Sequence, residues 1–455
     1  MLLRAGTLSE TDTFWEVRTG LLAIAKGSLP AADPFSWTVN GQPWTLNSWG
    51  FDVLAALAYR AAGLPAVALA CAGMAAAAFG LVLLQARVLG ARAPVASAAV
   101  LLVSPLLIAW LSARPQLVDY IAVPALVLLL QRLVAGRAGL LAVAGVGALT
   151  AAWVNLHAAA LLGVAVTGVV TGLVLVRRST RARGGWCAAA LGVSAVCSFL
   201  NPYGAGLFAQ TAQVQDSSAG VVTEWQHIDP ADPAQMTMLA LGLVALAIAL
   251  RQRDVVSVGA LGVAAAGSLG AIRILPILLL LALPVLAASA SQPLVRRSLR
   301  RWRAVVVPAA AAGLSAVAVM AFLGLGHLGQ PSPDQYSSAV VDAIPSGCRL
   351  FNSYALGGFV LLERPDVEVS LDSRNDLYGP TRVLADQRIL EGEGDTEQGL
   401  AGAGCVLIPP GTALGGYLAH SKEWERTARD SAAELFVRRQ PALSSKPACI
   451  SRRVF

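Results

Sequence analysis

The chain has 455 residues, of which 56% are hydrophobic and only 13% are charged, and its mean hydropathy is +0.63. Soluble domains usually carry about 25% charged residues, so this composition excludes an ordinary soluble protein. The formal net charge of +7 lies largely in short arginine-bearing connectors between apolar runs, and no basic patch is interleaved with aromatic residues. This placement argues against a nucleic-acid partner and indicates a protein embedded in a lipid bilayer.

The apolar residues are concentrated in the middle of the chain. Nearly all of the excess lies between Leu64 and Leu328, whereas the sequence from Gln330 onward has the mixed composition of a soluble domain. We therefore predict an α-helical polytopic membrane protein built from three parts. These are an N-terminal loop with short helices on the outer face over 1–60, a transmembrane helical bundle over 61–328, and a small extracytoplasmic α/β domain over 329–455.

A helix needs about 20 apolar residues to cross the hydrocarbon core of a bilayer. The apolar runs predict about ten spans, at 65–86, 94–111, 116–134, 138–154, 158–176, 186–200, 236–250, 254–272, 274–292 and 304–327. Arginines cluster after every second run, at Arg87, Arg92, Arg132, Arg137, Arg177, Arg178, Arg181, Arg183, Arg251, Arg253, Arg296, Arg297, Arg300, Arg301 and Arg303. The positive-inside rule places these connectors in the cytoplasm, so the alternate connectors and both terminal parts lie outside.

This orientation exports residues 1–60, although the first nine residues contain neither a signal peptide nor a spanning helix. Two explanations are open: a further helix is encoded upstream of Met1, or the inserted bundle carries the segment across the membrane. The first explanation is favoured.

The N-terminal segment contains the first candidate site residues. Asp12 is interpreted as a general base or as a ligand of a divalent cation, which Glu10 could share, and Arg18 as a partner for a phosphate. The same segment holds four tryptophans, Trp15, Trp37, Trp44 and Trp49. An aromatic belt at the level of the lipid headgroups explains the tryptophans equally well, but it does not explain the carboxylate of Asp12.

The outward connectors carry a second set of polar residues. Arg114 and Arg273 lie where the positive-inside rule disfavours them, and ionisable groups at membrane depth are functional candidates by default. Asn155 and His157 stand in an apolar run. We predict that these four residues bind substrate or phosphate. The alternatives are an Arg114–Asp119 ion pair and a histidine satisfied within the core. Glu224, Trp225 and Asp229 follow in a later outward loop and could complete the site.

No soluble-enzyme motif competes with this interpretation. The sequence has no Walker A pattern, which argues against an ATP-driven pump, and no HExxH motif. Its four histidines, His157, His227, His327 and His420, are not spaced as metal ligands.

The C-terminal part alternates short apolar runs with turns, which favours a small α/β domain. We predict strands at 349–354, 359–362, 367–371 and 405–408, helices at 381–389 and 412–420, and a final hairpin or strand pair at 424–439. Asp372, Arg374 and Asp376 could face the membrane site, but a solvated loop is the preferred interpretation. A disulfide is permitted outside the cytoplasm, and Cys348–Cys405 is the favoured pairing, with Cys449 left over.

Several segments together resemble a group of bacterial membrane proteins related to the GT-C glycosyltransferases. They are Thr-Asp-Thr-Phe-Trp at 11–15, Asp-Pro-Phe-Ser-Trp at 33–37, Ala-Arg-Pro-Gln-Leu at 113–117, Trp-Val-Asn-Leu-His at 153–157, Asn-Pro-Tyr-Gly at 201–204, Phe-Asn-Ser-Tyr at 351–354 and Ser-Leu-Asp-Ser-Arg at 370–374. The resemblance spans the chain and implies a GT-C-like bundle in a bacterial plasma membrane, with a polyprenyl-phosphate-linked sugar as donor. It also places Asp12 where the family carries an essential acidic residue in its first outer loop.

The leading hypothesis is an inverting membrane glycosyltransferase that moves a sugar from a polyprenyl-phosphate carrier to an outer acceptor. Asp12 would act as base or metal ligand, and Arg18, Arg114 and Arg273 would hold the phosphate. Two alternatives remain open: a non-catalytic scaffold or lipid-binding protein of the same fold in envelope assembly, and a transporter of a lipid-linked substrate. Internal symmetry between half-repeats would favour transport, and none is visible in the sequence.

Overall fold

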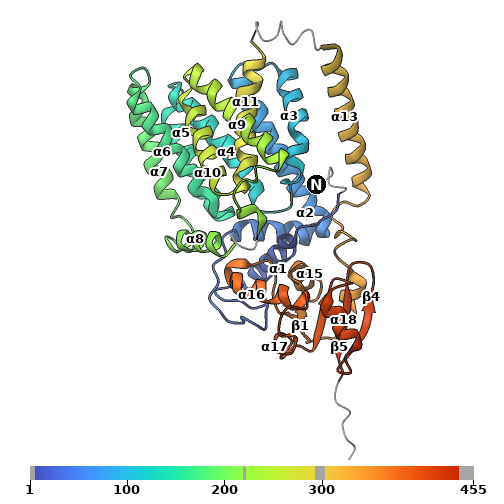
Figure 1. Ribbon diagram of the computed structural model, residues 1–455. Helices are drawn as coiled ribbons and strands as arrows, with labels where there is room; N and C mark the ends of the chain where they lie inside the picture. Colours follow the sequence, from blue (N-terminus) through green and yellow to red (C-terminus); the bar gives the residue numbers. More distant parts are fainter. Residues whose placement is uncertain (1–5, 219–221, 293–302, 440–455) are drawn as a thin grey trace, which may run out of the picture.

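The computed structural model describes residues 6–218, 222–292 and 303–439. A helical bundle stands above a smaller α/β domain, and helix α1 (Thr11–Lys26) lies between them (Figure 1). The predicted boundary at residue 60 falls inside helix α2 (Trp49–Val88), close to a kink in that helix. The arginine-rich connector at 293–302 and Cys449 lie outside the described residues.

The bundle contains the longest apolar helices of the chain. They are α2, α3 (Ala93–Ile108), α4 (Gln116–Val134), α5 (Gly139–Leu156), α6 (Leu161–Val176), α7 (Gly184–Cys197), α9 (Pro233–Gln252), α10 (Val255–Gly270), α11 (Leu275–Ala290) and α13 (Arg303–Leu325). Short 3-10 turns η2 (Ala158–Ala160), η3 (Arg181–Arg183), η4 (Thr223–Trp225) and η5 (Ile272–Ile274) and helix α8 (Gly206–Ser218) connect them. Each predicted span coincides with one of these long helices.

Among the described residues, six helical segments are long and apolar enough to cross a membrane. They begin at Trp49, Gln116, Gly139, Ala158, Pro233 and Ile272. Helices α3 and α10 are apolar but shorter, at 16 residues each. The protein is therefore a mostly helical, multi-pass membrane protein, and the count of about ten spans stays a prediction.

Helix α2 changes direction between Ala62 and Pro65. Gly63 has a φ of 66°, which a residue with a side chain rarely adopts, and Pro65 removes a backbone donor from the next turn. The segment before the kink lies across the end of the bundle and packs against α1, whereas the segment after it runs through the bundle (Figure 1). The first predicted span, 65–86, matches only this second segment.

The C-terminal domain is built on a mixed sheet, which within residues 303–439 has five strands in the order β2-β1-β3-β5-β4. The strands are β1 (Arg349–Asn352), β2 (Glu368–Val369), β3 (Cys405–Ile408), β4 (Trp424–Arg429) and β5 (Glu434–Arg438). The helices are α14 (Ser338–Asp342), α15 (Tyr354–Glu363), α16 (Asn375–Leu390), α17 (Thr396–Gly399) and α18 (Ala413–His420). Strand β1 is parallel to β2 and β3, and β5 is antiparallel to β3 and β4, as in an α/β domain with a terminal hairpin.

Most predicted elements of this domain are present, and one is wrong. The predicted strand at 359–362 lies inside helix α15, because a short apolar run buried on all sides does not by itself distinguish strand from helix. Gly357 and Gly358 let this helix pack closely against its neighbours. A Cβ on Gly357 would lie 2.1 Å from the Leu371 carbonyl oxygen, and a Cβ on Gly358 would lie 2.5 Å from the Thr11 carbonyl oxygen. The predicted Cys348–Cys405 disulfide is present, with a Cα–Cα distance of 6.2 Å.

The N-terminal segment is joined to the C-terminal domain along the edge of the sheet. Ser36 forms a parallel bridge with Val369 of β2, Thr38 donates to the Ser370 carbonyl, and Trp37 donates its indole N–H to the Leu350 carbonyl. These contacts cover the edge that β2 would otherwise leave open. The N-terminal segment from residue 6 onward and the C-terminal domain up to residue 439 therefore form one unit below the bundle.

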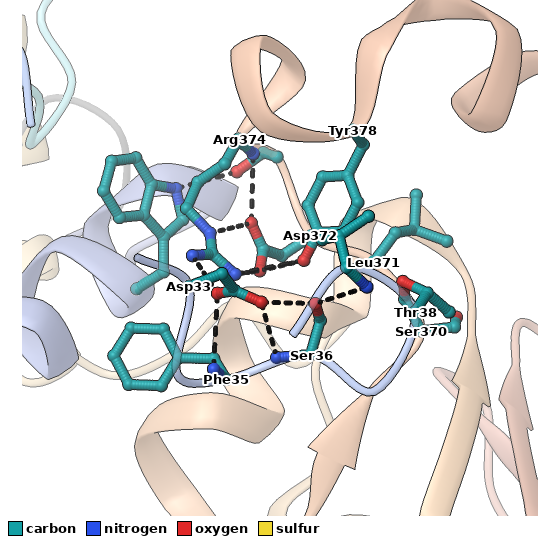
Figure 2. Close-up of polar contacts among 12 residues, drawn as sticks. Asp33, Phe35, Ser36, Thr38, Ser370, Leu371, Asp372, Arg374 and Tyr378 are labelled. Atoms are coloured by element: carbon teal, nitrogen blue, oxygen red, sulfur yellow. Dashed lines mark hydrogen bonds and ion pairs between the residues drawn. The ribbon is translucent and has the colours of Figure 1, made fainter. Parts of the chain in front are cut away.

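A buried arginine lies at the centre of this junction (Figure 2). The guanidinium of Arg374 lies 2.7 Å from Asp33 and 2.6 Å from Asp372, and all three side chains are 0% exposed. The Tyr378 hydroxyl donates to Asp372, and the rings of Trp44 and Phe35 face the guanidinium at 4.6 and 5.2 Å. The preferred interpretation of Asp372 and Arg374 as a solvated loop is therefore wrong. Arg374 pairs here with Asp33, which lies about 340 residues earlier in the sequence.

Replacing Arg374 by methionine is expected to destabilise the folded protein by about 3–5 kcal/mol, because two carboxylates would remain buried without a counter-charge. Denaturant unfolding of the full-length protein in detergent, followed by limited proteolysis, measures the loss. The matched control is Arg349→Met, whose pair with Glu368 spans 3.6 Å and is largely exposed. This control should change stability by less than about 1 kcal/mol. Equal stability of the two variants would contradict the assignment.

Candidate active site

A cavity of about 700 Å³ lies where the bundle, helix α1 and the C-terminal domain meet. Its walls carry an unusual number of charged and aromatic side chains for a membrane protein. They include Glu10, Asp12, Trp15, Glu16, Trp44, Arg114, His157, Trp225, Arg273, Tyr354, Ser373, Arg374, Asn375 and Asp376. Four predicted site residues, Asp12, Arg114, His157 and Arg273, are thus brought to one cavity from widely separated segments, together with Glu10.

Asp12 lies in the first turn of α1 and is held by three donors. Its Oδ2 atom lies 2.9 Å from the Arg114 guanidinium, and its Oδ1 atom accepts hydrogen bonds from the Ser373 hydroxyl at 2.5 Å and the Trp15 indole at 3.3 Å. Thr13 of the same turn donates to the Ala113 carbonyl, which fixes α1 against the connector that carries Arg114. Asp12 therefore links the bundle to the C-terminal domain through one carboxylate.

Arg114 is shared by three carboxylates. Besides Asp12, its guanidinium lies 2.7 Å from Glu224 and 3.7 Å from Glu10. Burial alone would lower the pKa of Arg114, but the surrounding carboxylates, Asp12 foremost, raise it. The predicted alternative of an Arg114–Asp119 ion pair is wrong, because Asp119 pairs with His157 instead.

His157 is oriented by a buried carboxylate. Its Nδ1 atom lies 2.8 and 2.9 Å from the two oxygens of Asp119, which is 4% exposed and also accepts a hydrogen bond from the Trp153 indole at 2.8 Å. A carboxylate on one ring nitrogen fixes the orientation of an imidazole. The Nδ1 side of the ring is therefore committed to Asp119, while the residue still lines the cavity.

Arg273 differs from Arg114 in its surroundings. Its guanidinium stacks on the Trp225 ring at 4.2 Å, and among the described residues no carboxylate lies within ion-pair distance of it. Arg273 also lines a second cavity of about 350 Å³, which has mostly apolar walls from α4, η2, α6 and α11. A cation without a paired anion therefore lies at the junction of a polar and an apolar cavity.

The C-terminal domain contributes one wall of this cavity, a position that the sequence left only as the second interpretation for its charged run at 372–376. Ser373, Asn375 and Asp376 line the cavity at the start of α16. The Asp376 carboxylate accepts a hydrogen bond from Gln210 of α8 at 2.6 Å, and burial raises its pKa to about 6. The run Ser-Leu-Asp-Ser-Arg was visible in the sequence, but nothing there indicated which of its side chains face the cavity.

Glu16 of helix α1 is a further carboxylate that lines the cavity. It is 2% exposed, and burial together with the nearby carboxylate of Asp52 raises its pKa well above the usual range. Its Oε2 atom has no hydrogen-bond partner among the described residues. Glu16 follows Asp12 by one helical turn on the same face of α1.

Two predicted site residues lie outside the cavity. Arg18 packs its guanidinium over the Phe35 ring at 5.7 Å, one and a half turns beyond Asp12. Asn155 accepts a hydrogen bond from the Trp49 indole at 3.0 Å and donates to the carbonyls of Ala151 and Leu200 at 2.7 Å. Neither position supports the predicted phosphate contact, because both polar groups are directed at neighbouring protein segments.

The predicted divalent cation does not fit these side chains. Both oxygens of Asp12 are engaged by Arg114, Ser373 and Trp15, and a guanidinium 2.9 Å away would repel a metal ion. In the part of the chain that the structure describes, no group of three or more His, Cys, Asp or Glu side chains is placed to hold a metal. Metal ligation by Asp12 and Glu10 therefore finds no support in this geometry.

The architecture has counterparts among solved membrane proteins. ArnT from Cupriavidus metallidurans bound to undecaprenyl phosphate matches with a TM-score of 0.57 and 15% sequence identity, over 96% of this chain and 95% of that chain. Its apo state gives a TM-score of 0.56. The chain has a GT-C fold. The apo oligosaccharyltransferase of Archaeoglobus fulgidus is also similar, with a TM-score of 0.54 and 12% identity over 88% of this chain and 66% of that one.

The GT-C resemblance seen in the sequence is thereby confirmed at the level of the fold. No protein-family model and no curated protein matches the sequence. The fold is therefore shared, but at 12–15% sequence identity no residue role can be transferred from these structures. The roles of individual side chains must be argued from the geometry of the cavity.

Asn155→Leu is expected to lower the stability of the GT-C bundle by about 1–3 kcal/mol, because the Trp49 indole and the Leu200 carbonyl would lose their partner. Thermal unfolding of the full-length protein in detergent measures the change. Asn40→Leu provides a control at an exposed position of the N-terminal segment, where a change below about 0.5 kcal/mol is expected. A stability of Asn155→Leu equal to that of this control would refute its structural role.

Proposed function

We propose that the protein is a GT-C-type membrane glycosyltransferase that transfers a sugar from a polyprenyl-phosphate donor to an acceptor on the outer face of a bacterial plasma membrane. The observation that carries the proposal is the position of Arg273, which forms no ion pair with the described residues and lies between a polar and an apolar cavity. A lipid-linked phosphate combines an anion with an apolar chain, and this junction offers a place for each. The undecaprenyl phosphate bound to ArnT is a ligand of this chemical class.

The donor would lie with its phosphate near Arg273 and His157 and its prenyl chain along the apolar cavity. Among the described residues Arg273 has no carboxylate within ion-pair distance, and its stacking on Trp225 holds the guanidinium plane. His157, oriented by Asp119, lines the larger cavity, which Arg273 also lines. The apolar walls of α4, α6 and α11 then bury the first prenyl units, which stabilises the complex through removal of apolar surface from water.

The reaction we propose is a single inverting displacement. The acceptor hydroxyl loses its proton to the Asp12 carboxylate, its oxygen bonds to the anomeric carbon of the sugar, and the bond from that carbon to the phosphate oxygen breaks. The leaving polyprenyl phosphate keeps the electron pair and gains a negative charge, which Arg273 stabilises. Stabilisation of charge that develops at the transition state is the usual source of a large rate enhancement.

Asp12 must first be released from its donors, and the charges around Arg114 suggest how. Three carboxylates share this one guanidinium. A donor phosphate that enters the cavity competes for Arg114, so binding would draw the guanidinium away from Asp12. The carboxylate then regains a lone pair that can accept a proton. In this proposal the base becomes active only when the anionic donor is bound.

The outward orientation of the site is part of the proposal. The Cys348–Cys405 disulfide is favoured in an oxidising compartment, and the bulk of the arginine-bearing connectors lie at the opposite ends of the predicted spans. Both observations support an extracytoplasmic C-terminal domain. The cavity between this domain and the bundle would then open at the outer membrane surface.

Replacing Asp12 by asparagine is expected to lower transfer at least a hundredfold, because general-base catalysis contributes about 10²–10⁴ to the rate. The assay follows labelled sugar from a panel of undecaprenyl-phosphate hexoses and pentoses, with purified full-length protein in nanodiscs. Binding of undecaprenyl phosphate itself, measured by native mass spectrometry, should survive in Asp12→Asn but weaken at least tenfold in Arg273→Gln. The exposed Arg137→Gln serves as the matched arginine control.

Equal transfer by wild type and Asp12→Asn would overturn the role of Asp12. If the wild type transfers no sugar but binds undecaprenyl phosphate through Arg273, the non-catalytic lipid-binding alternative is favoured. Absence of both activities would reject the donor class altogether.

A further inference from the structure

The wall that the C-terminal domain contributes to the cavity carries unused hydrogen-bond acceptors. Asn375 is only 9% exposed, and its Oδ1 atom has no hydrogen-bond partner among the described residues. Its neighbour Asp376 has a single side-chain donor, Gln210, on one of its two carboxylate oxygens. Buried polar atoms are normally satisfied, so an unpaired amide oxygen in a cavity wall points to a ligand that donates to it.

We propose that Tyr354, Asn375 and Asp376 form the acceptor subsite of the transfer proposed above, and that they bind a carbohydrate acceptor through its hydroxyl groups. The inference rests on that proposed function, and it assigns to the C-terminal domain the choice of acceptor. The donor site at Arg273 belongs to the bundle, so the two substrates are held by different parts of the chain.

The chemistry of the wall determines which groups it can hold. The free atoms of Asn375 and Asp376 are both acceptors, so the ligand must bring O–H or N–H groups to them. A phosphate or carboxylate would be repelled by Asp376 and would find no cation here, because Arg374 is already saturated by Asp33 and Asp372. The acceptor moiety at this wall is therefore neutral or cationic.

Two features favour a carbohydrate over a peptide. Asn375 and Asp376 are adjacent in sequence, and neighbouring hydroxyls on one sugar ring can donate to two acceptors that lie side by side. The cavity is also lined by the aromatic side chains of Trp15 and Tyr354, which both contact Ser373, and of Trp44, which faces Arg374. Such rings offer flat apolar surfaces with polar edges, against which the C–H face of a pyranose or furanose can pack. A peptide would present one backbone N–H per residue and requires neither feature.

The test uses full-length protein in phospholipid nanodiscs and saturation-transfer NMR. The probes are the methyl glycosides of glucose, galactose, mannose and arabinose, with a blocked Ala-Ser-Ala tripeptide as the competing ligand class. Asp376→Asn and Asn375→Ala each remove one acceptor, and Glu393→Gln is the matched control at an exposed position just beyond α16. At least one glycoside should bind wild type and control alike and bind both site variants about tenfold more weakly or worse, since a hydrogen bond to a charged or buried group is worth roughly that factor.

Three results would overturn the inference: no glycoside binds the wild type, both site variants bind glycoside as the control does, or the tripeptide binds in place of the sugars. Asn375→Ala carries the test if Asp376→Asn does not fold. Undecaprenyl phosphate binding, measured on the same samples, separates the two proposals. Its loss in Arg273→Gln supports the donor site whatever the glycosides do, and glycoside binding that depends on Asp376 stands even if that lipid does not bind.

Discussion

The geometry of the cavity depends on the buried guanidinium of Arg374. A charge removed from water is tolerated only when its partners are present, and here they are Asp33 from the N-terminal segment and Asp372 from the C-terminal domain. Because Asp372 and Arg374 are both fixed, the residue between them is fixed as well. That residue is Ser373, whose hydroxyl donates to Asp12. The same anchor sets the start of α16, and so the positions of Asn375 and Asp376.

The three arginines of the cavity differ in the groups that surround them, and these groups decide how much positive charge each can offer to a ligand. Arg374 is fully buried between two carboxylates, and Arg114 is shared by three, so an anion must compete with these carboxylates for either charge. Arg273 has an aromatic ring where the others have acids. Of the three arginines, Arg273 therefore contributes most of the positive potential that an anion would meet in the cavity. Three arginines of equal formal charge thus have three different surroundings: Arg374 anchors two segments, Arg114 restrains Asp12, and Arg273 is the one that we propose attracts a phosphate.

The sequence predicts the bundle well because the bilayer imposes one length and one polarity on every span, and this holds whatever the neighbouring helices are. Arg114, His157 and Arg273 were found for the same reason, since ionisable residues at that depth are unusual. Arg18 was selected for its place shortly after Asp12 and Asn155 for its place in an apolar run, but they contact Phe35, Trp49 and nearby carbonyls. The sequence shows that a polar side chain is present, but the packing of two helices decides which way it points.

Asp372, Arg374 and Asp376 were interpreted as a solvated loop in preference to a position at the membrane site, for a different reason. Their partners lie on segments that no local pattern connects to them, at Asp33 and in α8. A charged run in a soluble-looking domain is usually solvated, and only the N-terminal segment packed along strand β2 removes the water here. The consequence reaches beyond the fold. An inverting displacement needs acceptor and leaving group on opposite sides of the reacting carbon. A cavity walled on one side by the bundle and on the other by a domain anchored through Arg374 can hold two substrates in that relation.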